Sequence, residues 1–600
     1  MKKNVIIIIS ICVLAIILSI ILSWVYFKFS YFEPDTTSYL FQAKIFERGK
    51  LCYDAPPEYG FSSSPHVNIL NDKWYSKYPF GNALMLMFGE FFNAPWIVPA
   101  IATGFALLLL YLIALKIYGR TIAFIAIILG LISPATLGMG CNWFSESVSR
   151  FYLAIYVLGL IMTLRDIKNE WFFSGKKPKN PPLSPFFKGG IISTICHNLK
   201  TSVKFLQRLK QKRWIFPLIS GFSLGYAFNT RPMPAIAFGV AGAGLAIYWI
   251  AKYNIKLTLN LRALKKMNAS VHYNEFSKNR IFLNRMIIFL LPFAFMMIMS
   301  MAWNFYFTDN PLKFTHNAAQ PYDKIGFGKR TESYEPDLNN AFNFTPKWAV
   351  ERIWRHTIPC ISFNTLGWGY YRPNIIADLR NYEPFILSRQ ILLIRFIPLA
   401  FPIILMLIPL FHPSRNCYDF FFFSLLILNM ALYFFFYFDG TTWGVTPVNA
   451  RYYTECTLLG IIPLVARGMF IVYGWIRKIP TKIPIIIVAI LLLTLTVNTV
   501  YTYVYIGKPY RNWGDIYQKL PGIVKQQDLH NAVIFVPNTR DAPLSDYPFK
   551  SLDEADVVYF RLGPSKQWGL NNSDWRKVYD QYFKGRQAYI YESGKLSPLI

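Results

Sequence analysis

MKKN followed by VIIIISICVLAIILSIILSWVYF (Val5–Phe27) opens the chain. A helix needs about 20 apolar residues to cross the hydrocarbon core of a bilayer. This run is longer than the core of a signal peptide and lacks a small-residue cleavage site. We therefore expect a retained first membrane span, with its N-terminus and two lysines in the cytoplasm.

The composition agrees with a membrane protein. Hydrophobic residues make up 54% of the 600 residues, aromatic residues 18% and charged residues only 16%, which is outside the usual range of soluble chains. The net charge of +30 does not form a nucleic-acid-binding stripe. The seven cysteines show neither a disulfide framework nor a CxxC pair.

Ten further apolar runs follow the first. At about 20 residues per span, the sequence predicts a polytopic all-α protein with spans at 4–27, 95–116, 121–139, 148–164, 214–230, 232–250, 286–307, 388–410, 418–438, 453–472 and 483–505. Around Asn229–Pro232, the two short runs are also compatible with one broken helix or a re-entrant turn.

The distribution of charge orients these spans. Residues 165–213 and 251–285 are rich in Lys and Arg and lie between apolar runs, as expected of cytoplasmic loops. With eleven spans, the segments 28–94, 140–147, 308–387, 439–452 and 506–600 are then extracytoplasmic.

Two of these outer regions have recognisable structure. Residues 36–48 have helical periodicity, with Tyr39, Leu40, Ala43 and Phe46 on one face, so we expect a helix lying flat on the membrane and ending at Gly49. Residues 506–600 are water-like in composition. Strands at 532–536, 557–560 and 588–591, with helices at 511–527 and 574–583, predict a small α/β domain after a transmembrane domain of residues 1–505.

Candidate functional residues lie in the outer loops. Asp35 follows the first span, and its simplest role is that of a helix N-cap. Lys77 precedes the second span, where a lysine binds an anionic headgroup or extends its ammonium to the interface.

Three more charged residues lie next to outer helix ends. Glu146 is an acid close to hydrocarbon, which costs free energy unless it has a partner and is a functional candidate for that reason. Arg231 and Arg451 are suited to an anionic ligand, with a structural salt bridge as the alternative. We expect all five residues to meet in one cavity at the membrane surface.

The motifs resemble the GT-C superfamily of polytopic glycosyltransferases, in the bacterial branch related to protein O-mannosyltransferases and aminoarabinose transferases. Residues 1–475 carry the resemblance, in the segments PDTTSY (34–39), YSKYPFG (75–81), KIYGRTIAFIAIILGLISPATLGMGCNWFSES (116–147), LISGFSLGYAFNTRP (218–232) and NARYYTECTLLGIIPL (449–464). Two departures are Glu146, where many relatives have Asp, and Tyr78-Pro79 after Lys77 in place of Pro-Pro.

The resemblance implies inverting transfer of a sugar from a polyprenyl-phosphate donor to a lipid, glycan or protein acceptor at the outer face of a bacterial plasma membrane. Asp35 would be the catalytic base, assisted by Glu146, and Lys77, Arg451 and Arg231 would bind the donor phosphate. We further expect Glu33, Tyr39 and His66 to contact the acceptor or the sugar. No cofactor is required, and a divalent metal at Glu146 is left open.

Two alternatives belong to other functional classes. A transporter or flippase of lipid-linked sugars would also need many spans and basic outer residues, together with a polar path through the membrane. A cell-envelope assembly scaffold would use the outer loops only as structure. Neither a GxGxxG nor a P-loop pattern occurs in the basic loops, so a nucleotide-linked donor is not indicated.

Overall fold

The computed structural model describes residues 2–30, 34–55, 66–173, 214–252, 272–319, 325–330, 342–353, 357–366, 389–436, 449–477, 497, 519–537, 555–562 and 575–599. Its N-terminal part contains α1 (Lys2–Phe27), α2 (Pro34–Glu47), β1 (Tyr53–Asp54), β2 (Val67–Leu70), β3 (Lys73–Ser76), α3 (Phe80–Glu90), α4 (Ile97–Tyr118), α5 (Arg120–Ile132), α6 (Pro134–Gly140) and α7 (Glu146–Phe173).

The middle of the chain is also helical. It contains α9 (Ile215–Phe228), α10 (Pro232–Lys252), α11 (His272–Thr308), α12 (Thr315–Ala319), β4 (Gly328–Arg330), β5 (Phe342–Phe344), α13 (Pro346–Arg352), α14 (Ile358–Leu366), α16 (Arg389–Phe411), α17 (Cys417–Phe434), the 3₁₀ turn η6 (Asn449–Tyr453), α18 (Thr454–Cys456), the π-helix η7 (Thr457–Ile461) and α19 (Ile462–Ile476).

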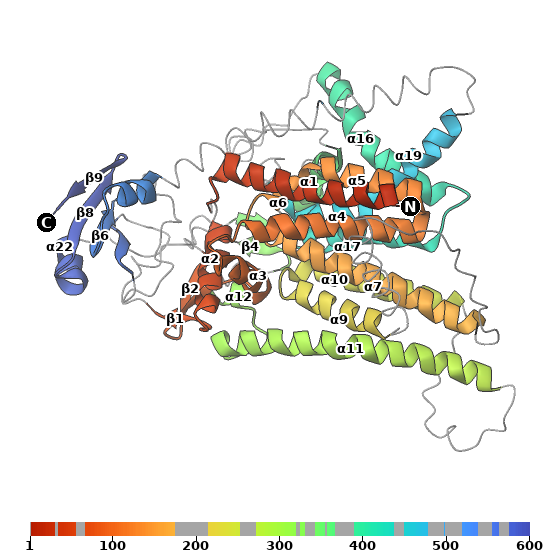
Figure 1. The fold of residues 1–600 in the computed structure, drawn as a ribbon, viewed down its shortest axis with the longest axis horizontal. Helices are drawn as coiled ribbons and strands as arrows, with labels where there is room; N and C mark the ends of the chain where they lie inside the picture. Colours follow the sequence, from red (N-terminus) through yellow and green to blue (C-terminus); the bar gives the residue numbers. More distant parts are fainter. Residues whose placement is uncertain are drawn as a thin grey trace, which may run out of the picture.

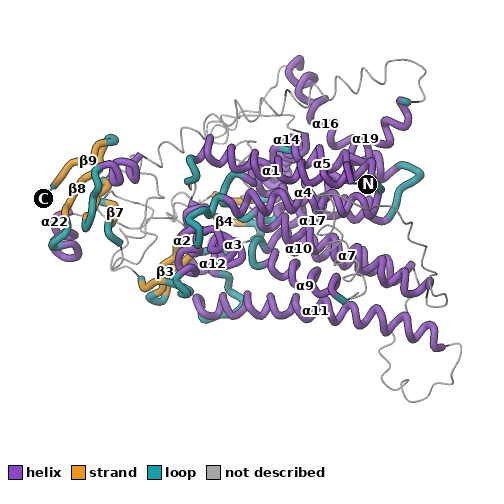
Figure 2. The backbone as a smooth tube through the Cα atoms, in the orientation of Figure 1, coloured by secondary structure: helices purple, strands orange, loops and turns teal. Residues whose placement is uncertain are grey.

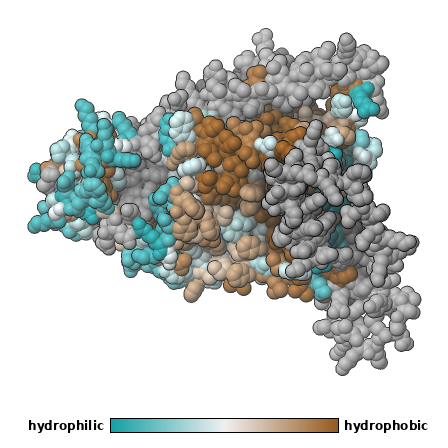
Figure 3. Space-filling view, viewed as in Figure 1, coloured by the Kyte–Doolittle hydropathy of each residue, from teal (hydrophilic) through white to brown (hydrophobic). Residues whose placement is uncertain are grey.

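The long helices form one bundle (Figure 1). α4 packs between α1 and α7, α9 packs between α7 and α11, and α10 packs along α17. α1 and α11 expose rows of large apolar side chains on their outer faces, such as Ile6 and Leu291. In Figure 3 apolar residues cover the side of the bundle, as lipid contact requires.

Within the described residues, seven helices are long and apolar enough to cross a membrane, or eight if α5 and α6 form one bent span. The predicted number of eleven is therefore not confirmed. The predicted span 214–230 contains the apolar helix Ile215–Phe228, which is shorter than a span. The predicted span 388–410 corresponds to the 23-residue α16, in which the apolar stretch is Ala400–Phe411. The predicted span 483–505 lies outside the described residues, apart from Val497.

The break between α5 and α6 is located at Ser133–Pro134, where the two helices are bent by 55°. A residue before proline avoids the helical conformation, and proline is favoured at the start of a helix. The buried Arg150 then donates hydrogen bonds to the Ala135 and Thr136 carbonyl oxygens, at 2.7 and 3.3 Å. These bonds hold α6 against the start of α7.

The predicted surface helix exists as α2, but its surroundings differ from the prediction. Tyr39 and Leu40 contribute to one apolar cluster, while Phe41 and Ile45 contribute to another on a different side of the helix. α2 is thus buried on several faces rather than lying flat on the membrane, because α3 and the antiparallel sheet β1-β3-β2 cover it. It ends at Glu47, two residues before Gly49, the predicted end, which has φ +70°.

Gly81 joins this outer region to the bundle. Its amide donates to the Asn229 carbonyl oxygen at 2.8 Å, and a Cβ at Gly81 would lie 2.7 Å from that same oxygen. Only glycine permits so close an approach of two backbones. The loop that carries Lys77 is therefore fixed against the turn that carries Arg231.

A separate four-stranded sheet follows the bundle, with β6 (Ala532–Val536), β7 (Val557–Arg561), β8 (Gln587–Glu592) and β9 (Lys595–Pro598) in the order β7-β6-β8-β9. α22 (Trp575–Val578) and η10 (Tyr579–Phe583) pack on it through Val578 and Phe583. The three predicted strands are confirmed, and β9 was not predicted. In Figure 2 this sheet lies beyond the end of the bundle that carries α2.

Candidate functional site

Charged side chains from five separate segments meet at one end of the bundle. They come from the first turn of α2, the loop after β3, the first turn of α7, the α9–α10 turn and the η6–α18 segment, and they are Asp35, Lys77, Glu146, Arg231, Arg451 and Glu455. The five charged residues singled out from the sequence are therefore together, with one further acid among them.

Asp35 forms the closest of these contacts. One carboxylate oxygen lies 2.9 Å from an Arg451 guanidinium nitrogen, and the other accepts a hydrogen bond from the Tyr78 hydroxyl and lies 3.7 Å from His66 Nε2. Asp35 is in the first turn of α2, which begins at Pro34. The partial positive charge of a helix N-terminus also favours a carboxylate there.

The electrostatics of Asp35 reflect these neighbours. Burial raises the pKa of the carboxyl group, but the positive charge of Arg451, with smaller contributions from His66 and Lys77, lowers the pKa to about 2. Burial, followed by the charge of Lys77, lowers the pKa of His66 well below its usual value. At neutral pH, Asp35 is therefore ionised and His66 is neutral.

A chain of alternating charges continues from Arg451 into the bundle. Glu146 lies 3.8 Å from Arg451 Nε and accepts a hydrogen bond from Arg231. Arg231 Nε in turn lies 2.9 Å from Glu455 Oε1. The two atoms form an ion pair but no hydrogen bond, because the Nε–H is not directed at this oxygen. The Tyr433 hydroxyl also lies 3.1 Å from Arg231. Arg231 is thus held between two fully buried carboxylates.

Lys77 is buried beside this chain. Its backbone amide donates to the His66 carbonyl oxygen, and its own carbonyl oxygen accepts from the Thr315 hydroxyl at 2.8 Å. Its ammonium lies 5.1 Å from the centre of the Tyr78 ring, and its charge acts on Asp35. The hairpin β2–β3 fixes the backbone on its N-terminal side.

The three predicted acceptor or sugar contacts have different outcomes. His66 is beside Asp35, as described above. Tyr39 stacks on Tyr78 with 4.6 Å between ring centres and donates to the Ser145 hydroxyl at 3.1 Å. Glu33 lies outside the described residues.

Glu455 was missed from the sequence, although it stands four residues after Arg451 in the quoted segment NARYYTEC. It is fully buried, and an acid at the start of an apolar helix is the signal that identifies it. The π-helix η7 follows immediately. Such π-turns are rare and are frequent at functional sites.

Glu455→Gln tests the inner end of the charge chain. Removing one partner of a buried ion pair costs about 3–5 kcal/mol, so we expect a clear fall in the thermal unfolding midpoint of the purified protein. The exposed Glu592 provides the matched control, because Glu592→Gln removes the same charge from a strand end. Equal midpoints for both variants would mean that Glu455 does not stabilise Arg231.

No protein-family model and no curated protein sequence matches the chain. Solved structures do match. The chain is similar to ArnT from Cupriavidus metallidurans bound to undecaprenyl phosphate, with 12% identity and a TM-score of 0.45 over 98% of this chain and 93% of ArnT. It is also similar to an Archaeoglobus fulgidus oligosaccharyltransferase tethered with an acceptor peptide, with 13% identity and a TM-score of 0.41 over 92% of this chain.

The chain spans 60% of the length of the archaeal protein. A third structure, of the archaeal enzyme AglB in complex with an inhibitory peptide and a dolichol-phosphate, matches with 15% identity and a TM-score of 0.40. At these identities and TM-scores, the activity has to be inferred from this chain's own residues.

Proposed function

We propose that this protein is an integral membrane glycosyltransferase that transfers a sugar from a polyprenyl-phosphate donor to an extracytoplasmic acceptor. One observation supports the proposal above the others. A buried carboxylate, Asp35, lies 2.9 Å from Arg451 and within the field of Lys77. The site thus combines a proton acceptor with cations for a phosphate.

In the proposed reaction, Asp35 takes the proton from an acceptor hydroxyl group as the acceptor oxygen attacks the anomeric carbon. The bond between that carbon and the phosphate oxygen breaks on the opposite side, so the configuration inverts. Negative charge then develops on the departing lipid phosphate, where Lys77 and Arg451 stabilise it. Arg231 is held by Glu146 and Glu455, so it contributes mainly by positioning Glu146.

The charges around Asp35 make its strength as a base depend on whether the donor phosphate is bound. The three cations Lys77, Arg231 and Arg451 face the three acids Asp35, Glu146 and Glu455, so the formal charges of these six side chains cancel. A bound phosphate adds negative charge beside Arg451 and Lys77, so Asp35 loses part of the attraction that lowers its pKa. Its burial then raises the pKa and makes it a stronger base.

Donor binding should therefore separate two pH profiles. In the free protein, Asp35 has a pKa of about 2, so kcat/KM should show no acid limb from this group between pH 4 and 8. With donor bound, the pKa of Asp35 is higher, and kcat should fall at a higher pH than kcat/KM as the pH is lowered. Steady-state rates across this range test the prediction, and identical acid limbs would contradict it.

The positions of the basic loops support an extracytoplasmic site. The basic stretch 165–213 runs from the last turns of α7 to the start of α9, and the basic stretch 251–285 runs from the end of α10 into the first half of α11. The functional residues lie at the opposite ends of α7, α9 and α10. Under the positive-inside rule, the loops face the cytoplasm and the site faces outward, with residues 506–600 as an extracytoplasmic domain.

The direct test is mass spectrometry of cell-envelope glycans and glycolipids from cells with and without the gene, repeated with Asp35→Ala. Loss of one sugar in both the deletion and the variant is expected, and it identifies donor and acceptor together. A variant that restores the sugar in full would favour the transporter or the scaffold.

A further inference from the structure

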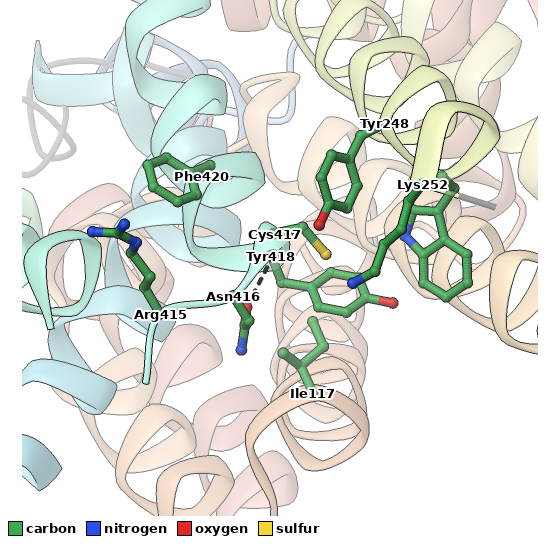
Figure 4. A pocket seen from close by; sticks show the side chains of 9 residues that line it. Ile117, Tyr248, Lys252, Arg415, Asn416, Cys417, Tyr418 and Phe420 are labelled. Atoms are coloured by element: carbon green, nitrogen blue, oxygen red, sulfur yellow. Dashed lines mark hydrogen bonds between the residues drawn. The ribbon is translucent and has the colours of Figure 1, made fainter. Parts of the chain in front are cut away.

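A polar cavity lies at the end of the bundle opposite to the charged site. It has a volume of about 480 Å³, within the range of about 300–1,000 Å³ usual for small-molecule sites. It is lined by Ile117, Tyr248, Trp249, Lys252, Arg415, Asn416, Cys417, Tyr418 and Phe420 (Figure 4). α10 begins next to Arg231 and ends at Lys252. Its 21 residues place the cavity about 30 Å from the charged site.

The lining of this cavity is suited to an anion. Two cations, Lys252 and Arg415, line it from different helix ends. In Figure 4 the Arg415 guanidinium points away from the other cation, whereas the Lys252 ammonium and the Tyr248 hydroxyl point toward Cys417 and Tyr418. These groups are donors of the kind that bind phosphate oxygens.

The acid beside the cavity, Asp419, does not cancel the positive charge of Lys252 and Arg415. Asp419 is the one acidic residue in α4, α10 and α17, the three described helices that border the cavity. One of its carboxylate oxygens accepts from Arg467 at 2.8 Å and from the Tyr118 hydroxyl at 2.7 Å. The other accepts from the Asn416 amide at 2.8 Å. Because Arg467 offsets Asp419, Lys252 and Arg415 leave the cavity with a net positive charge.

An apolar surface leads away from the cavity toward the middle of the bundle. α10 exposes Val240 and Ile247, at 51% and 63%, and α17 exposes Phe420 and Ile427, at 51% and 45%. Each pair is seven residues apart and therefore lies on one face of its helix. The two helices pack against each other, and Phe420 itself lines the cavity, so the exposed apolar face of α17 begins at the cavity and is suited to acyl chains.

We propose that this cavity binds the phosphate of an anionic phospholipid, with the phosphate beside Lys252, Tyr248 and Tyr418, the positive charge of Arg415 at its edge, and the acyl chains along α10 and α17. The aromatic residues Tyr248, Trp249 and Tyr418 belong to the same arrangement, because Tyr and Trp favour the membrane–water interface. This site is independent of the proposed transfer reaction and requires only that the bundle is in a bilayer.

The test uses the full chain purified in neutral detergent, with lipid binding measured by native mass spectrometry. Phosphatidylglycerol should bind more tightly than phosphatidylcholine. The double variant Lys252→Gln/Arg415→Gln should weaken phosphatidylglycerol binding by roughly fivefold for each cation removed. The matched control is Arg120→Gln/Arg477→Gln, which removes two exposed cations at the same end of the bundle that do not line the cavity, and it should bind like the unchanged chain.

Three results would overturn the proposal. They are equal binding of the two lipids, an equal loss in the control variant, and displacement of phosphatidylglycerol by inorganic phosphate at the same concentration, which would assign the site to a soluble anion. Lys252→Arg/Arg415→Lys keeps both charges and should retain binding. It therefore separates loss of the cations from loss of the fold, and failure of this variant to bind while folded would also contradict the proposal.

Discussion

Replacing Asp35 by asparagine is expected to lower the rate of sugar transfer by about 10²–10⁴-fold, the usual contribution of a general base. Asparagine has the shape of aspartate and still accepts the hydrogen bond from Tyr78, but it does not take up the acceptor's proton. In this variant Arg451 still has the Glu146 carboxylate at 3.8 Å. The buried guanidinium therefore keeps one negatively charged partner. The rate is measured in membranes with the donor identified by the glycan comparison.

The control for this variant is Asp309→Asn. Asp309 is exposed and accepts a hydrogen bond from Asn71 at 3.0 Å, so its loss should change neither the rate nor the yield of folded protein. If Asp35→Asn folded normally and were as active as the unchanged chain, another group would be the base or the protein would not be an enzyme.

Arg451→Lys should lower the transfer rate by about 10²–10³-fold, as expected when one stabilising donor is removed from a developing anion. Arg451 lies between Asp35 and Glu146, with its guanidinium 4.2 Å from the centre of the Phe144 ring. A lysine retains the charge but lacks the planar fork that contacts two carboxylates and an aromatic face together. The donor's KM should rise with the fall in kcat, because the same group binds the phosphate.

Arg467→Lys is the matched comparison for this substitution. Arg467 also forms a buried pair with an aspartate, at 2.8 Å from Asp419. Asp419 is 14 residues before Tyr433, which contacts Arg231, so this pair lies about 21 Å along α17 from the charged site. Arg467→Lys should therefore lower the thermal unfolding midpoint more than it lowers the rate of sugar transfer. An equal loss of rate in both variants would show that Arg451 acts through the fold alone.

Much of the charged site could be predicted from sequence, and for a physical reason. Acids and arginines next to apolar spans cost free energy unless they have partners, so Glu146, Arg231 and Arg451 stand out without a structure. Which acid pairs with which cation could not be predicted. Arg231 pairs with Glu146 and Glu455 because α7, α18 and the α9–α10 turn pack together, and those contacts are distant in sequence.

The fold was predictable to a similar extent. The end of α2 close to Gly49 and the strands of the C-terminal sheet followed from local patterns. The number of spans did not, because hydropathy alone does not distinguish a full span from the bent α5–α6 pair or from the 14-residue α9. Periodicity identified α2, but it did not reveal that its polar face would also be covered.

The π-helix at Thr457–Ile461 has a consequence for comparing this chain with its relatives. A π-turn accommodates one residue more than an α-helical turn, and each residue of an α-helix rotates the chain by about 100°. A homologue lacking one residue here would close the π-turn to an α-helical turn and keep both flanks in register, including the positions equivalent to Arg451 and Glu455. Alignments across this segment should therefore allow a single-residue gap, or equivalent charges will be paired with the wrong columns.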